Sequence, residues 1–91
     1  IPSDNTYIDP SIMGLNVFPN PSYGDFIVTV DLADVQKINV RIVGVDGKTI
    51  YCNDIEGLQH YEIRKRLELP GTYIIEVSTI ADKQSKAIVV Y

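Results

Sequence analysis

The chain has few of the residues from which catalytic and metal sites are built. It contains no tryptophan, one cysteine and one histidine among 91 residues. A single cysteine forms no internal disulfide, and a single histidine completes no zinc site. A nucleophilic thiolate at Cys52 needs a neighbouring base, whereas His60 is expected on the outward face of its strand. We therefore predict a protein that is not an enzyme, with no metal and no cofactor, and interpret Cys52 as a small core residue.

Basic residues are also scarce. Eight lysines and arginines stand against twelve aspartates and glutamates, which gives a formal net charge of −4. A nucleic-acid partner requires clustered basic side chains. The one basic run, residues 64–66, is flanked by Glu62 and Glu68 and sends neighbouring side chains to opposite faces of a strand. The sequence therefore argues against a nucleic-acid partner.

Long apolar segments are missing as well. No run approaches the roughly 18 apolar residues that a membrane-spanning helix needs, and no signal peptide is recognisable at the start. Because Ile1 is not a start methionine, we expect a piece of a longer protein whose export signal lies upstream. With 45% hydrophobic residues, a chain of this length suits one small domain with one core.

Acidic residues at the expected turns do not form a calcium loop. They are Asp31, Asp34, Asp46, Asp54 and Glu56. Their spacing lacks the D-x-[DN]-x-[DN]-G pattern that gathers oxygen ligands around Ca²⁺. We interpret these residues as turn formers.

The first fourteen residues differ from the rest of the chain. Residues 1–14 mix Pro, Ser, Asp and Asn with isolated apolar positions, which predicts a linker with a few docking contacts. From Leu15 onward, short apolar runs of period two alternate with turn residues, as in antiparallel strands with one buried face. We therefore place the domain at residues 15–91.

The period-two pattern predicts about seven strands. They are expected at residues 15–18, 25–32, 37–43, 48–52, 60–69, 72–80 and 85–91. Asp46 and Gly47 between the third and fourth strands favour a type I′ hairpin. Lys65 interrupts the apolar row of the fifth strand, which indicates a bulge, a sheet edge or a snorkelling side chain. So many short strands predict an all-β fold, a small immunoglobulin-like antiparallel β-sandwich without its disulfide.

A proline motif before the second strand is the most informative local pattern. Pro19, Asn20 and Pro21 are followed by Gly24 and then by Phe26. Turn chemistry alone accounts for these residue types, because proline stops a strand and glycine adopts a backbone conformation that other residues resist. The motif gains meaning from three pieces that follow it.

The three pieces are a turn, a strand start and a strand led by lysine. They comprise Asp46 and Gly47, then Gly71 and Tyr73, and finally Lys86, Ile88, Val89 and Val90. With the proline motif, in this order, they resemble the C-terminal sorting domain of the type IX secretion system of Bacteroidota (the Por secretion system sorting domain, type A). The likeness covers residues 17–91.

This resemblance implies a role as an export address. It implies an N-terminal cargo that reaches the periplasm through an upstream signal. The outer-membrane secretion machinery then recognises the domain and directs the cargo to the cell surface or the medium. In many members a sortase-like processing protease then removes the domain.

An edge strand offers unpaired backbone groups to an extended partner, and the last strand is the expected edge. The expected recognition residues are Lys86, Ile88, Val89 and Val90, with Gly71 and Tyr73 beside them. Removal of residues 86–91 is accordingly expected to block export more than it unfolds the domain.

Two other functions stay open. A carbohydrate-binding or adhesive sandwich requires an exposed aromatic platform, although the six tyrosines are scattered along the chain. An inert spacer domain of the fibronectin type predicts no partner.

Overall fold

The computed structural model describes residues 11–91, where every regular element is a β-strand. The strands are β1 (Ile12–Phe18), β2 (Asp25–Leu32), β3 (Ile38–Gly44), β4 (Thr49–Ile55), β5 (His60–Arg66), β6 (Gly71–Ser78) and β7 (Lys83–Val90). A helix long and apolar enough to cross a membrane does not occur in this part of the chain.

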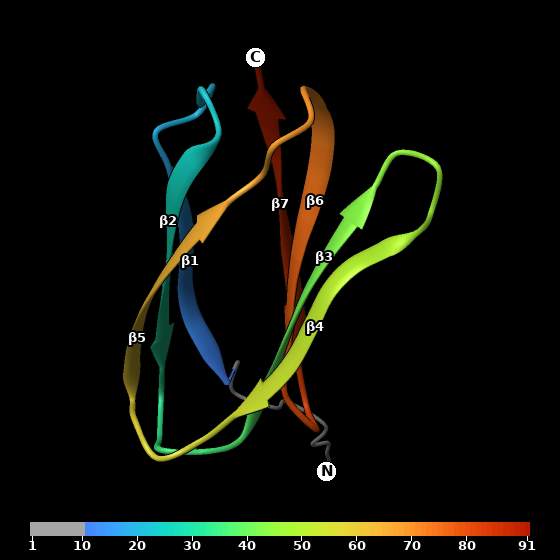
Figure 1. Cartoon of the computed structure of the whole chain (residues 1–91). Helices are drawn as coiled ribbons and strands as arrows, with labels where there is room; N and C mark the ends of the chain where they lie inside the picture. The colour runs from blue at the N-terminus through green and yellow to red at the C-terminus, as the bar shows by residue number, and fades with distance from the viewer. Residues whose placement is uncertain (1–10) are drawn as a thin grey trace, which may run out of the picture.

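The strands form two antiparallel sheets that face each other (Figure 1). One sheet has the order β1-β2-β5 and the other β4-β3-β6-β7. The chain therefore passes between the sheets after β2, after β4 and after β5. The prediction of an all-β sandwich of about seven strands is confirmed.

The core lies between the sheets and follows from alternation along the central strands. In β2 every second side chain, from Phe26 to Leu32, is buried, and β3 and β6 repeat the pattern. Val28 and Val77 are fully enclosed. Burial of a side chain of this size stabilises the fold by about 1.5–3 kcal/mol, so the strand period determines which residues form the core.

Six of the seven strands differ from their predicted bounds, and β1, β4 and β5 differ most, by three residues at one end. β5 ends at Arg66 rather than at Leu69. β1 begins at Ile12 rather than at Leu15, and the Ile12 side chain is only 1% exposed. A register shift between Ile12 and Gly14 interrupts the period-two pattern there, which hid the start of the strand. β4 continues to Ile55 instead of ending at Cys52. Residues 1–10 of the predicted linker lie outside the described residues.

The predicted type I′ turn between β3 and β4 is wrong. The Gly47 amide donates to the Gly44 carbonyl at 3.0 Å, and the Gly44 amide donates to the Lys48 carbonyl at 2.9 Å. The central residues of the turn are therefore Val45 and Asp46. Gly47 follows them with a φ of 84°, the arrangement of a three-residue hairpin loop that ends in a left-handed glycine.

Lys65 lies on an edge strand, which was one of its three predicted explanations. Within residues 11–91, β5 pairs only with β2, and the register of this pair is continuous through Lys65. The Lys65 ammonium lies 3.5 Å from the ring centroid of Tyr51 on β4. A cation–π contact with this ring stabilises a half-buried charge.

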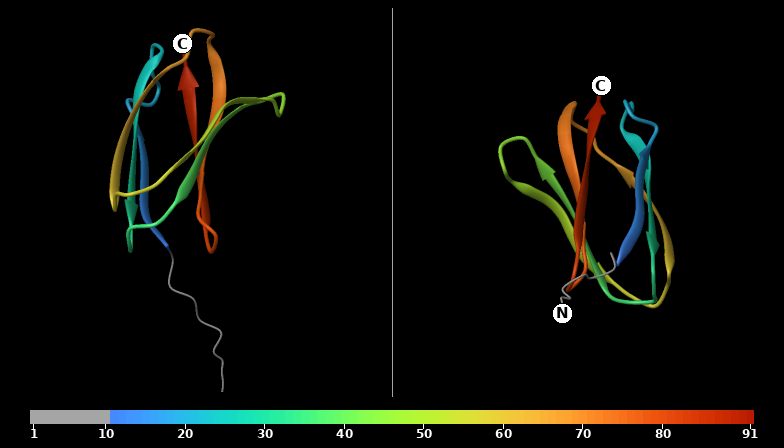
Figure 2. Two further views of the ribbon diagram at one scale, coloured as in Figure 1. Left: turned by 60° about the horizontal axis from the view of Figure 1, so that its bottom comes forward. Right: turned by 180° about the vertical axis from the view of Figure 1, so that it is seen from behind.

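The edge strands β1 and β7 belong to different sheets and face each other along one side of the sandwich (Figure 2). We call the side where β1 and β7 meet the seam. At the end where β1 begins, side-chain hydrogen bonds join the two strands across it. The Ile12 amide donates to Asp82 Oδ2 at 3.2 Å, and Gln84 Nε2 donates to the Ile12 carbonyl at 3.0 Å. The first and last described strands are therefore joined by side chains.

Candidate functional site

The pieces of the sequence motif gather at one end of the sandwich (Figure 1). The β1–β2 connection, the β3–β4 turn, the start of β6 and the end of β7 all lie at the end where the C-terminus emerges. The connections β2–β3, β4–β5 and β6–β7 lie at the opposite end. The topology thus brings together residues that are far apart in the sequence.

Two of the motif pieces are paired directly. Gly71 lies opposite Val90, and Tyr73 lies opposite Ile88, in the antiparallel ladder of β6 and β7. The Tyr73 hydroxyl also donates to the carbonyl of Leu69 just before β6. The start of β6 and the end of β7 therefore form one structural unit.

The predicted recognition residues divide into a buried and an exposed group. The side chains of Ile88 and Val90 are 0% and 3% exposed, and Tyr73 is also buried. Lys86 is exposed and Val89 is 38% exposed. In the folded domain a partner reaches only the exposed group, because the others form the core.

The Asn20 side chain binds the outer edge of β7. Asn20 Nδ2 donates to the Ala87 carbonyl at 2.8 Å, and the Val89 amide donates to Asn20 Oδ1 at 3.1 Å. The side-chain amide therefore makes the pair of hydrogen bonds that a peptide group of a neighbouring strand would make. Pro19 and Pro21 on either side each follow a cis peptide bond.

The main chain of Ser22 continues this pairing. Its amide donates to the Val89 carbonyl at 2.8 Å, and its carbonyl accepts from the Tyr91 amide at 2.8 Å. These bonds form a parallel bridge between Ser22 and Val90. We call residues 20–22 the clip. β7 is an edge strand as expected, but the clip occupies its backbone groups at the C-terminal end, so the expected free edge is absent there.

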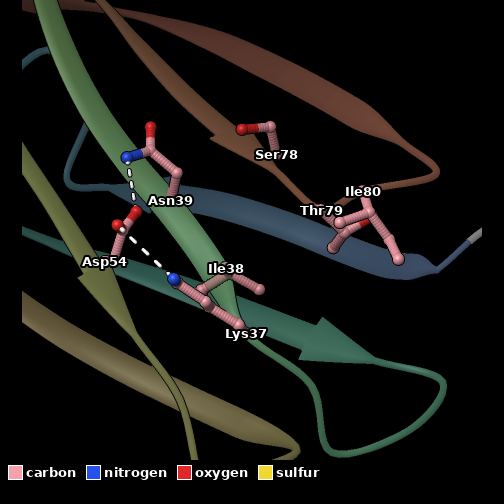
Figure 3. A pocket seen from close by; sticks show the side chains of 7 residues that line it. All are labelled: Lys37, Ile38, Asn39, Asp54, Ser78, Thr79 and Ile80. Carbon is pink, nitrogen blue, oxygen red and sulfur yellow. Dashed lines mark hydrogen bonds and ion pairs between the residues drawn. The ribbon is translucent and has the colours of Figure 1, made fainter.

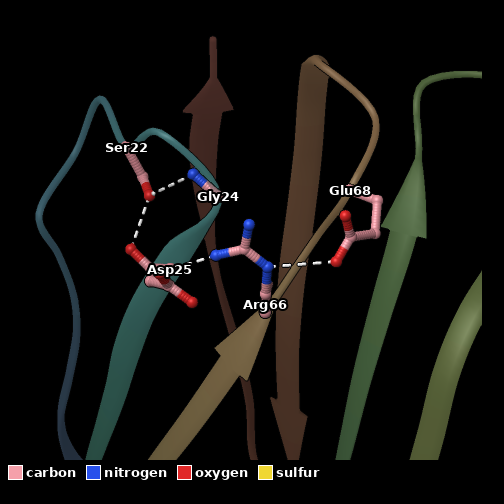
Figure 4. A network of polar contacts seen from close by, with 5 residues as sticks. All are labelled: Ser22, Gly24, Asp25, Arg66 and Glu68. Atoms are coloured by element: carbon pink, nitrogen blue, oxygen red, sulfur yellow. Dashed lines mark hydrogen bonds and ion pairs between the residues drawn. The ribbon is translucent and has the colours of Figure 1, made fainter.

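A buried serine and a glycine fix the chain after the clip (Figure 4). Ser22 Oγ accepts from the Gly24 amide at 3.0 Å and donates to the Asp25 carbonyl at 2.6 Å. Gly24 has a φ of 125°, and a Cβ atom there would lie 3.1 Å from the Leu67 carbonyl oxygen. Phe26 then enters the core. These contacts set the position from which the clip reaches β7.

Arg66 links the start of β2 to the segment that follows β5 (Figure 4). Its guanidinium lies 2.7 Å from Asp25 Oδ2 and 3.0 Å from Glu68 Oε2. Asp25 first, and then Glu68, raise the pKa of Arg66 further above its alkaline ordinary value. A raised pKa in the folded state contributes stability below the unfolded pKa, and this contribution is lost only as pH rises through the folded pKa. Because these groups are exposed, the contribution is small.

The β3–β4 turn shares a groove with the start of β6. The groove has a volume of about 350 Å³ and lies between the β3–β4 turn and the segment before β6. Asp46, Gly71 and Tyr73 line it together with the exposed apolar side chains of Val45 and Leu69. Gly47, in contrast, does not line this groove. Its left-handed conformation ends the hairpin loop.

Two exposed tyrosines next to the clip were not singled out by the sequence. The ring centroids of Tyr23 and Tyr91 lie 5.7 Å apart with the planes inclined by 52°. Both side chains are largely exposed. No local signal predicts this pair, because it depends on the clip bringing the β1–β2 connection against the end of β7.

The opposite end of the sandwich has a second hollow (Figure 3). Its polar side chains bind each other: Asn39 Nδ2 donates to Asp54 Oδ1 at 2.8 Å, and Lys37 Nζ lies 3.8 Å from Asp54 Oδ2. Cys52 is exposed rather than in the core, and its Sγ accepts from Asn39 Nδ2 at 3.3 Å. The core interpretation of Cys52 was wrong because β4 is an edge strand with little buried surface.

The remaining candidate groups form no chemical site in the described part of the chain. His60 Nδ1 is bound to Asp31 Oδ1 on the exposed surface of the neighbouring strand. Within residues 11–91, no group of three or more His, Cys, Asp or Glu side chains is placed to hold a metal ion.

Comparison with known protein families identifies a match. A family model described as a secretion system C-terminal sorting domain matches residues 16–91. A search of the curated proteins found no match. The matched region contains the clip, the β3–β4 turn, and the paired ends of β6 and β7.

Proposed function

We propose a mode of recognition for this chain, which belongs to the family of secretion system C-terminal sorting domains. The family is one of sorting signals rather than enzymes, and it serves type IX secretion in Bacteroidota. The parent protein is therefore secreted or displayed on the cell surface. In our proposal, the folded domain is recognised in the periplasm by the outer-membrane translocon, which then directs an attached N-terminal cargo outward.

One observation supports this proposal above the others: the motif residues converge on one end of the sandwich. Val89 is exposed at this end, and Lys86 is exposed farther along β7, opposite Ile75 in the middle of the β6–β7 ladder. Among residues 11–91, Lys86 has no ion-pair partner, so its charge is available to another molecule. We assign Lys86 and Val89 to partner contact and assign Tyr73, Ile88 and Val90 to holding the strand in place.

The family relationship also supports a processing step. In this proposal a sortase-like protease removes the domain after translocation. The domain then acts as a transient address, and the mature cargo functions without it.

The test is export of a fluorescent passenger that carries a signal peptide and is fused to residues 1–91, in a type IX-competent Bacteroidota host. Lys86→Gln keeps the side chain long but removes its charge. Loss of a charge-assisted hydrogen bond of about 1.5–3 kcal/mol weakens binding by about tenfold or more, so we expect the passenger to accumulate in the periplasm. Surface and medium fluorescence measures this outcome.

Lys83→Gln is the matched control, because Lys83 is an exposed lysine on the same strand that already pairs with Glu76. We expect this variant to be exported normally. Normal export of Lys86→Gln would reject the role of Lys86. Periplasmic retention of the unaltered fusion would reject the sorting function itself.

A further inference from the structure

We propose that Asn20 is a positioning residue of the sorting signal. In this inference, which rests on the proposed function, the clip fixes the last residues of β7 on the sandwich. The translocon then meets the clip and the end of β7 as one folded surface and recognises its side chains. It does not add a strand to a free edge at this end.

The chemistry of the clip suits a fixed attachment. Proline has no amide hydrogen, so the segment around Pro19 and Pro21 forms no regular ladder with β7. The Asn20 side chain supplies one donor and one acceptor in place of a peptide group. Ser22 then supplies its own main-chain amide and carbonyl. The segment thus satisfies the outward backbone hydrogen-bonding groups at the end of β7 without forming a strand itself.

The hydrogen bonds along the outer edge of β7 indicate what kind of partner fits. The outward backbone groups at the C-terminal end are the Ala87 carbonyl, the Val89 amide and carbonyl, and the Tyr91 amide. All four are bound by Asn20 or Ser22. An extended segment would have to break these bonds before it paired with β7.

Side chains offer the alternative means of recognition. Val89 and the Tyr23–Tyr91 pair are exposed around the clip. Tyrosine is enriched among the residues that dominate binding at protein interfaces. A partner with apolar and aromatic-binding pockets therefore fits this surface. Because both tyrosines lie beside the clip, their relative placement depends on Asn20.

The chain provides an internal control for this inference. At the other end of the same seam, the Gln84 side-chain amide donates to the Ile12 carbonyl on β1. Gln84 therefore also uses an amide group to hold an edge strand, but it lies near the start of β7, opposite Val77. Replacing either Asn20 or Gln84 by alanine should weaken the attachment of β7. Only the replacement of Asn20 should also abolish export.

Hydrogen exchange and export test the inference together. In Asn20→Ala, measured on the full chain, we expect the exchange rates of the Val89 and Tyr91 amides to rise about tenfold, as expected from loss of one or two hydrogen bonds. The amides of Ile75 and Val77 should keep their protection. The passenger fusion with Asn20→Ala should be retained in the periplasm, and Gln84→Ala should be exported.

Asn20→Asp distinguishes the contributions of the two hydrogen bonds that the Asn20 side-chain amide makes. It keeps an acceptor for the Val89 amide but loses the donor to the Ala87 carbonyl. We expect Val89 to keep more protection than in Asn20→Ala, and export to fall because the carboxylate repels that carbonyl. Full export of Asn20→Asp, with Val89 exchanging as in the unaltered chain, would show that the acceptor alone suffices and would overturn the two-bond clip.

The remaining outcomes distinguish this inference from the proposed function. Unchanged exchange at Val89 and Tyr91 in Asn20→Ala would reject the clip. Faster exchange with normal export would reject its positioning role, and so would equal retention of Asn20→Ala and Gln84→Ala. Each of these results leaves the sorting function intact provided that the unaltered fusion is exported. Retention of the unaltered fusion would reject the sorting function and, with it, the inference.

Discussion

At the scale of single residues, Gly24 has the tightest requirement at the β1–β2 connection. Its φ of 125° lies in a region that side chains other than glycine rarely adopt. The Leu67 main chain lies against it, and the Leu67 amide donates to the Gly24 carbonyl at 2.9 Å. Glycine at this position therefore permits both the turn and the close approach of the Leu67 main chain.

Gly24→Ala is expected to lower the free energy of unfolding by about 1–3 kcal/mol, because both backbone strain and a steric contact oppose the new methyl group. Gly57→Ala is the matched control. Gly57 also has a positive φ, of 107°, but a Cβ atom there meets nothing within 4 Å. Urea denaturation of both variants measures the difference. Equal losses would show that the contact with Leu67 has no energetic effect.

Single residues also show where sequence reasoning reaches its limit. The anomaly at Lys65 was visible because a lysine interrupts an apolar row. Its partner Tyr51 was not, because that contact joins strands of different sheets. Asn20 was recognised as a turn residue, but its bonds reach partners 67 and 69 residues away. Local patterns reveal an unusual residue, whereas the fold determines what it touches.

At the scale of elements, prediction succeeded where one face of a strand is completely buried. The bounds of β2, Asp25–Leu32, agree with the predicted strand because its alternation is unbroken. β4 was predicted too short because, as an edge strand, it has few buried positions and its polar end shows no alternation. The start of β1 was predicted three residues too far along the chain because the strand's register shifts near its beginning. Edges and bulges weaken the periodic signal.

Neighbouring residues of β7 are expected to respond differently to truncation. Ile88→Ala should lower the free energy of unfolding by about 2–5 kcal/mol, because Ile88 is fully buried. Val89→Ala should change it by less than about 0.5 kcal/mol, because its side chain lies on the outer face. Thermal unfolding of both variants measures these effects. A large loss for Val89→Ala would place its side chain in the core and remove it from the proposed recognition surface.

At the scale of the whole molecule, the sequence predicted the components of the candidate site but not their assembly. The order β4-β3-β6-β7 places the start of β6 beside the end of β7, and the β1–β2 connection approaches the same strand from the other sheet. Strand order is set by how the sheets bury their apolar faces against each other, and strand periodicity does not encode it. The convergence of the motif therefore became visible only in three dimensions.

Removal of residues 86–91 is expected to disrupt the whole domain. The truncation deletes the buried Ile88 and Val90 and the partners of the clip. It also deletes five pairs of the β6–β7 ladder, from Ile75 opposite Lys86 to Gly71 opposite Val90. Two buried aliphatic side chains contribute about 4 kcal/mol or more, which is comparable with the 5–15 kcal/mol that stabilises a whole domain. The structure therefore argues against the expectation that this truncation blocks export more than it unfolds the domain.

Circular dichroism and proton NMR of the truncated chain measure this effect. We expect loss of the cooperative thermal transition and of dispersed amide signals. Removal of Tyr91 alone is the control, because this exposed residue contributes one main-chain bond to Ser22 and its ring contact with Tyr23. That variant should stay folded. A cooperative transition near the unaltered midpoint in the longer truncation would show that the sandwich closes without the end of β7, and export of the truncated fusion would then report on recognition alone.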